Sequence, residues 1–129
     1  MGLMAVSVLL RPNAPSVGTE ICRLDDIDEV GARGFSFGQG PESFDFFVVR
    51  HGGGIEGYVN DCPHTGGPLD WKPDQFLNVN KSLILCATHG ALFRIEDGAC
   101  IAGPCPGARL TPVPLEVRDG AILVGKVEA

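Results

Sequence analysis

The sequence has little that would suit a nucleic acid or a membrane as a partner. Lys and Arg number 10 against 16 Asp and Glu, and the formal net charge is −6. Phosphate backbones and anionic membrane surfaces select clusters of basic side chains, which this chain lacks. No stretch approaches the roughly 20 apolar residues of a membrane-spanning helix. We therefore expect neither a nucleic acid nor a membrane as a partner.

The sequence also lacks the signs of secretion. Residues 1–10 are mostly apolar, but they have no charged segment before them and no clear cleavage site of small residues, so we expect no signal peptide. Five cysteines are an odd number, which does not complete a disulfide framework. A reducing compartment suits such a chain, and we expect a cytoplasmic protein.

The composition predicts one all-β domain over residues 1–129. Hydrophobic residues make up 44% of the chain and charged residues 20%, which is typical of a globular protein. The 18 glycines and 10 prolines favour turns over helix interiors. No internal repeat, heptad or low-complexity tract is present, and the chain is too short for a second domain with its own core.

Short apolar segments separated by Gly, Pro, Asn and Asp predict antiparallel strands joined by hairpins. The expected turns are the glycines at 52–54, Asp97-Gly98 and Arg118-Asp119-Gly120. The acidic stretch 23–30 predicts a single helical turn. The expected strands are residues 20–24, 34–37, 44–50, 55–60, 82–86, 91–95, 99–102, 115–117 and 121–124.

Two of the three histidines lie within three residues of a cysteine. The pairs are Cys62-Pro63-His64 and Cys86-Ala87-Thr88-His89, and each follows an expected strand and precedes glycine. Thiolates are soft charged ligands, and imidazoles are neutral ones that place less negative charge on a metal. Cys62, His64, Cys86 and His89 are therefore the candidate metal ligands.

The spacing C-x-H followed by C-x-x-H resembles the motif of Rieske [2Fe–2S] proteins. The resemblance extends to His89-Gly90-Ala91-Leu92-Phe93, which follows the second ligand pair. It also includes Gly103-Pro104-Cys105-Pro106, which is similar to the proline loop that covers the cluster in that family. It spans residues 44–125.

This resemblance implies a [2Fe–2S] cluster, with Cys62 and Cys86 on one iron and His64 and His89 on the other. It implies Rieske-like antiparallel sheets, in which a base domain of N- and C-terminal segments holds an inserted cluster-binding subdomain of about residues 57–106. The implied function is one-electron transfer from a reductase to an oxygenase or other terminal oxidoreductase. These partners are redox proteins; we expect no small-molecule substrate and no catalytic residues.

Respiratory members of the family join their ligand loops by a disulfide at the positions of Gly67 and Thr88 here. The chain therefore resembles the disulfide-free ferredoxins that serve oxygenases. High-potential members have a serine and a tyrosine at the positions of Ala91 and Phe93, where they donate hydrogen bonds to the cluster sulfurs. Their absence predicts a potential near the low end of the Rieske range.

Other interpretations stay open at this point. The chain could be the Rieske small subunit of a stable oxidoreductase complex, such as a nitrite reductase. It could also be a zinc-stabilised or metal-free binding module, although structural zinc sites usually have C-x₂₋₄-C and H-x₃₋₅-H spacing. Cys22 and Cys100 are expected in the core, His51 in a solvated turn, and Trp71 packed under the first ligand loop. Cys105 is expected near the cluster, with its role open.

Overall fold

The computed structural model describes residues 8, 11–28, 30–52, 54–61, 69, 75–78, 80–86, 90–103 and 108–125. This part of the chain is nearly all β-structure, which confirms the expected fold class. Its elements are β1 (Glu20–Arg23), η1 (Leu24–Asp26), β2 (Gly31–Phe37), η2 (Gly40–Glu42), β3 (Phe44–His51), β4 (Gly54–Val59), β5 (Leu83–Cys86), β6 (Ala91–Arg94), β7 (Cys100–Ala102), β8 (Leu115–Arg118) and β9 (Ala121–Val124). Within these residues no helix is long and apolar enough to cross a bilayer.

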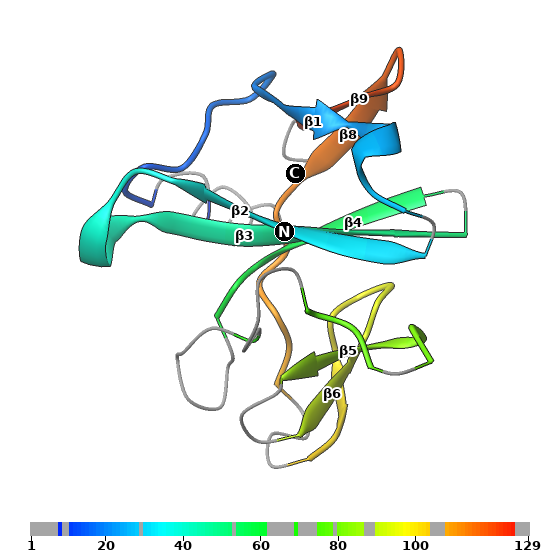
Figure 1. Ribbon diagram of the computed structural model, residues 1–129. Coiled ribbons are helices and arrows are strands. Elements are labelled where there is room, and N and C mark those ends of the chain that lie inside the picture. The colour runs from blue at the N-terminus through cyan, green and yellow to red at the C-terminus, as the bar shows by residue number, and fades with distance from the viewer. Residues whose placement is uncertain are drawn as a thin grey trace.

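The strands form three antiparallel sheets of three strands each, in the orders β1-β9-β8, β2-β3-β4 and β5-β6-β7. Figure 1 shows β1, β8 and β9 on one side of the β2-β3-β4 sheet and β5 and β6 on the other. The first strand of the chain pairs with the last, as expected for a base built from both ends of the sequence.

β3 lies between two hydrophobic cores. Phe47 and Val49 belong to the core shared with β5 and β6, whereas Phe46 and Val48 belong to the core shared with β9, and all four are fully buried. Successive side chains of a strand point to opposite faces, so a strand buried on both faces has a nearly continuous apolar sequence. The segment Phe44–His51 has that pattern.

Pairing between strands decides where β2 begins. The sequence predicts a start at residue 34, but β2 begins at Gly31, because Gly31 pairs with Arg50 and Ala32 with Val49 on the long neighbouring strand. The predicted helical turn in residues 23–30 is present as η1, whereas η2 has no counterpart in the prediction.

Two segments outside the named strands extend the sheets. Residues 76–78 run along β5, with the Leu85 N–H donating to the Phe76 carbonyl at 2.8 Å. Residues 111–113 run along β4, where the Val59 N–H donates to the Thr111 carbonyl at 2.9 Å. The second segment lies along the edge of β4 and follows the β5-β6-β7 sheet in the chain.

Tyr58 connects the middle sheet to the end of β6. Its side chain is 2% exposed, and its hydroxyl donates to the Ile95 carbonyl at 2.6 Å. Its ring packs so close to Gly98 that a Cβ at that position would lie 2.8 Å from it. Burial, with a smaller contribution from Glu56, raises the pKa of Tyr58. The phenol is therefore neutral and a permanent donor to Ile95.

We expect Tyr58→Phe to lower the free energy of unfolding by roughly 1–3 kcal/mol, because the Ile95 carbonyl loses its partner inside the core. Urea denaturation measures this loss, and Ser82→Ala, at an exposed hydroxyl, should change it by less than about 0.5 kcal/mol. Since the folded pKa of Tyr58 is raised, the wild type should lose stability as the pH rises above the value of about 10 of an unfolded tyrosine. Equal alkaline sensitivity in Tyr58→Phe would contradict this account.

Candidate metal centre

The second predicted ligand pair begins at the end of β5. Cys86 is fully buried and lies opposite Ala91 of β6. The Gly90 N–H donates to the Cys86 carbonyl at 2.8 Å, and Gly90 has a φ of +72°, a conformation that favours glycine. The connection between the two strands is thus closed at its base. His89 lies between them in the sequence, outside the described residues.

The sheet face that carries Cys86 is apolar. Ile84, Ala91 and Phe93 share this face, because alternate residues of a strand point the same way, and all are fully buried. None of the three has a side-chain hydrogen-bond donor. The surroundings of Cys86 on this sheet are therefore dry and of low polarity.

The first predicted ligand pair lies in the stretch between Asp61 and Leu69. The N–H of Leu69 donates to Oδ1 of Asn60 at 2.8 Å, which joins the two sides of this stretch. The Leu69 side chain is fully buried in the same core as Cys86. Cys62 and His64 themselves are outside the described residues.

The predicted proline loop begins at a tight contact. Gly103 has a φ of +96°, and a Cβ on it would lie 2.7 Å from the Cα of Ala91. On the far side of the loop, the Cys100 N–H donates to the Ala108 carbonyl at 2.9 Å. The loop thus starts beside β6 and ends beside β7. Cys105 is outside the described residues.

Of the four predicted ligands, then, the structure describes Cys86 alone, and no three His, Cys, Asp or Glu side chains of the described ranges gather as a metal site. Cys100 is buried in the same core as Cys86. Cys22 packs against the other core, where burial and then Asp26 raise the pKa of its thiol. Trp71, Gly67 and Thr88 lie outside the described residues.

His51 differs from its prediction as a solvated turn residue. It is the last residue of β3, its side chain is only 25% exposed, and Nε2 lies 3.8 Å from Oε2 of Glu56. Burial raises the pKa of Glu56, and His51 opposes this shift. The pair lies at the end of the β3–β4 hairpin.

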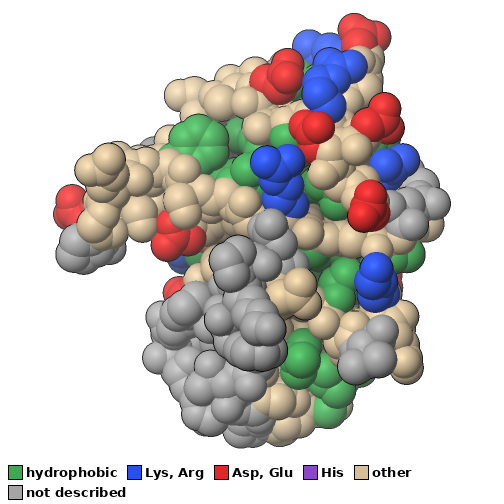
Figure 2. Space-filling model, in the orientation of Figure 1, with side chains coloured by type: hydrophobic (Ala, Val, Ile, Leu, Met, Phe, Trp, Pro, Cys, Tyr) green, Lys and Arg blue, Asp and Glu red, His purple; other side chains and the backbone are tan. Residues whose placement is uncertain are grey.

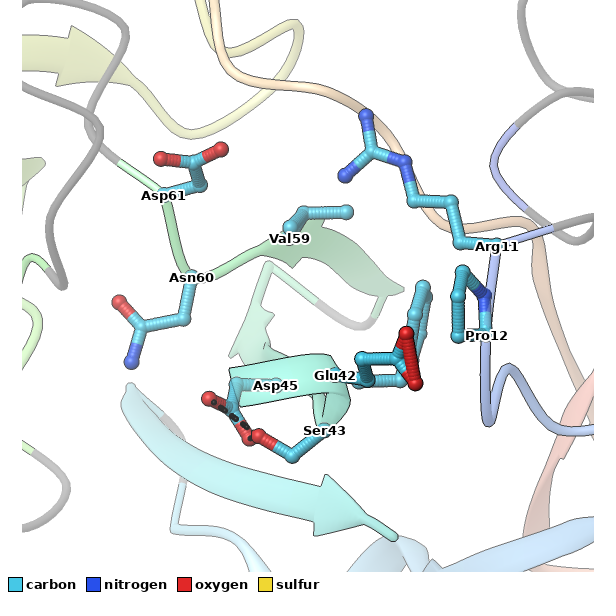
Figure 3. A pocket seen from close by; sticks show the side chains of 9 residues that line it. Arg11, Pro12, Glu42, Ser43, Asp45, Val59, Asn60 and Asp61 are labelled. Carbon is cyan, nitrogen blue, oxygen red and sulfur yellow. Dashed lines mark hydrogen bonds between the residues drawn. The ribbon is translucent and has the colours of Figure 1, made fainter. Parts of the chain in front are cut away.

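A pocket of about 360 Å³ lies beside the start of the first ligand stretch. Figure 3 shows Arg11 and Pro12 on one side of it and Asn60 and Asp61 on the other. Partial burial raises the pKa of the Asp61 carboxyl, and Arg11 lowers it. The pocket is lined mostly by polar and acidic residues, so it has no large apolar surface for a small-molecule substrate.

Comparison with known families decides the identity of this site. The model of the Rieske [2Fe-2S] domain matches residues 19–118. The chain belongs to the Rieske [2Fe–2S] family. Its cofactor is accordingly a [2Fe–2S] cluster, as the ligand spacing predicted.

Relatives by sequence are Rieske subunits of larger assemblies. The chain is 33% identical over 67 residues to the menaquinol:cytochrome c reductase iron-sulfur subunit of Geobacillus thermodenitrificans, covering 52% of this chain and 37% of the relative. It is 32% identical over 87 residues to the subunit of the same name from Bacillus subtilis, covering 67% of this chain and 50% of the relative. This chain thus spans half or less of their length.

Solved structures with the same fold include two Rieske ferredoxins. The ferredoxin of carbazole 1,9a-dioxygenase from Nocardioides aromaticivorans has a TM-score of 0.67 and 24% identity, covering 85% of this chain and 98% of that one. A ferredoxin of Sphingomonas yanoikuyae has a TM-score of 0.63 and 22% identity, covering 84% and 98% of the two chains. These likenesses establish the fold.

The described residues fit a Rieske cluster. A buried cysteine ends a strand, a left-handed glycine closes the connection after it, and a second glycine allows the start of the proline loop to approach β6. An added side chain at Gly103 would fill the space in which this loop meets Ala91. Close approach of backbone segments is what a glycine at such a position permits.

Sequence reasoning missed two residues whose side chains join separate parts of the chain, Asn60 and Tyr58. The sequence predicts Asn60 only as the end of a strand, although an Asn at such a position often bonds to nearby backbone groups. Tyr58 is the only tyrosine in the chain, and a buried tyrosine hydroxyl usually has a partner. Neither signal identifies the partner, which lies 9 residues away for Asn60 and 37 for Tyr58.

We expect Gly103→Ala to lower both the iron content and the melting temperature, because its Cβ would clash with Ala91. Such a clash typically costs about 1–3 kcal/mol, in addition to roughly 1–2 kcal/mol for a side chain in the left-handed conformation. Gly18→Ala is the matched control, since Gly18 has a φ of +89° with no atom within 4 Å of its added Cβ. Iron analysis should show full iron in Gly18→Ala, and thermal unfolding measures the melting temperature of both variants. Equal iron in both variants would contradict the steric argument.

Proposed function

We propose that Cys62 and Cys86 bind one iron of the cluster and that His64 and His89 bind the other. The C-x-H and C-x-x-H spacing supports this assignment, together with the burial of Cys86 at the end of β5. Thiolates stabilise ferric iron, whereas neutral imidazoles place less negative charge on theirs and raise its potential. The two irons would then be inequivalent, and the iron held by His64 and His89 would be the one that is reduced.

The protein is proposed to be a one-electron carrier and no enzyme by itself. When bound, a [2Fe–2S] cluster accepts and releases a single electron. The observation that carries this proposal is the ligand motif within a chain that has the Rieske fold. The pocket beside the ligand stretch is lined mostly by polar and acidic residues. In this role the chain takes an electron from a reductase and passes it to a terminal oxygenase or similar oxidoreductase.

We infer the branch of the family from two positions. Gly67 and Thr88 stand where the respiratory members have the cysteines of their inter-loop disulfide. Although the sequence relatives are subunits of quinol-oxidising complexes, this difference supports a disulfide-free ferredoxin. A stable complex would bury a large apolar interface, so a carrier should elute alone from size exclusion at micromolar concentration, and a co-eluting partner would favour the subunit role.

The surface of the β5-β6-β7 sheet has apolar side chains that a protein partner could contact. Leu85 and Leu92 are half-buried on its outer face, and Ile101 of β7 is 51% exposed, next to the start of the proline loop. Figure 2 shows hydrophobic side chains on the surface in this part of the molecule, while most charged side chains in that view lie over the other sheets. Apolar surface near a redox centre suits a transient contact between proteins.

We also propose one domain over residues 1–129, with a cluster-binding subdomain of about residues 57–106, and a cytoplasmic location. The β5-β6-β7 sheet falls within the proposed subdomain. The reducing environment inferred from the cysteines supports the location.

Freshly purified protein should be red-brown and give a rhombic EPR signal only after reduction with dithionite. Cys86→Ser and His64→Ala should abolish this signal and lower the melting temperature, because metal–ligand bonds stabilise the loops that they connect. Cys22→Ser is the control and should keep full iron. A colourless protein with one zinc per chain would contradict the proposed function, and iron lost only in Cys22→Ser would contradict the ligand assignment.

The midpoint potential should lie near the low end of the Rieske range of roughly −150 to +300 mV. Hydrogen bonds to the cluster sulfurs raise the potential, and Ala91 and Phe93 have no side-chain donor on the buried face that they share with Cys86. Ala91→Ser and Phe93→Tyr should therefore raise the potential. Protein-film voltammetry tests both statements; a wild-type value above about +100 mV, or no rise in either variant, would contradict them.

A further inference from the structure

Asn60 is fixed to the middle sheet by its backbone. It follows β4 directly, and its N–H donates to the Asp45 carbonyl at 2.9 Å, which continues the pairing of β3 with β4 by one more residue. Its side chain then reaches a different part of the chain, since Oδ1 accepts the N–H of Leu69 at 2.8 Å. Figure 3 shows that the side chains of Asn60 and Asp61 point in opposite directions from the backbone, and that the Asn60 amide points away from Arg11.

The other end of this bond is held by the hydrophobic core. The Leu69 side chain is fully buried and packs in the cluster of residues that includes Cys86. The hydrogen bond therefore connects two points that are each fixed independently, one by a β-ladder and one by core packing. Between them in the sequence lie Cys62 and His64.

We propose that Asn60 is a positioning residue for the [2Fe–2S] cluster. Its side-chain oxygen closes the base of the stretch that carries Cys62 and His64, so that less conformational entropy is lost when these residues bind iron. This role rests on the ligand assignment proposed above. Groups that orient metal ligands without touching the metal typically change metal affinity by 10–100-fold.

Asn78 offers a matched control. Its Oδ1 also accepts backbone N–H groups, from Ser82 at 2.9 Å and Leu83 at 3.1 Å, and it closes a turn before β5 that contains no proposed ligand. Asn60→Ala and Asn78→Ala thus remove the same type of bond. Asn60→Asp keeps an oxygen where Leu69 needs an acceptor and is the conservative variant.

The experiment measures the rate at which the oxidised full-length protein loses its visible absorption to an excess of iron chelator, with the reduced EPR spectrum and the melting temperature of each variant. We expect about tenfold faster loss in Asn60→Ala, with a broadened EPR signal, and rates within about threefold of wild type in Asn78→Ala and Asn60→Asp. The melting temperatures of the two alanine variants should fall by similar amounts, so a general loss of stability would not produce this pattern.

Equal rates in Asn60→Ala and Asn78→Ala would overturn the proposal, and so would a rate in Asn60→Asp as fast as in Asn60→Ala. If Asn60→Ala gives no folded protein, Asn60→Ser replaces it, because the shorter hydroxyl does not reach Leu69, and the same outcomes decide. Failure of the proposed function is distinguishable, since it would remove the [2Fe–2S] spectrum from the wild type and from all variants alike.

Discussion

Burial of β3 on both of its faces is the constraint on which the rest of the structure depends. Phe46 and Val48 pack in the core shared with the β1-β9-β8 sheet. Phe47 and Val49 pack in the core shared with the β5-β6-β7 sheet, which contains Cys86. One strand thereby holds the two other sheets in place. Because a protein interior is close-packed, a change in side-chain volume on either face of β3 is transmitted to its surroundings. The β1-β9-β8 and β5-β6-β7 sheets are therefore coupled through the packing of β3.

The connections around the β5-β6-β7 sheet are closed by hydrogen bonds and glycines. The bond from Gly90 to Cys86 closes one connection, the bond from Leu69 to Asn60 another, and Gly103 brings the start of a third against β6. The first two contacts each give a backbone N–H its hydrogen-bond partner, and a backbone group satisfied in this way has little reason to rearrange. Segments arranged so can meet a metal cluster with little loss of conformational freedom.

The same fold occurs in proteins with different partners. Sequence likeness leads to subunits of quinol-oxidising complexes, whereas the fold is shared with ferredoxins at less than 25% identity. One scaffold serves both, because the strands and cores determine the fold, while the partner is determined by local features. In this chain the features proposed above are Gly67, Thr88 and the exposed Ile101 of β7.

The sequence by itself determined the family, the all-β class and most strand positions, because alternation of side chains, turn residues and ligand spacing are local patterns. Asp119 and Gly120, for example, have the positive φ values of a hairpin turn, as that dipeptide predicts. Only the tertiary structure decided that Asn60 bonds to Leu69 and that Tyr58 bonds to Ile95. These contacts join residues 9 and 37 positions apart, and which partner a side chain meets depends on how the sheets pack, for which no local pattern exists.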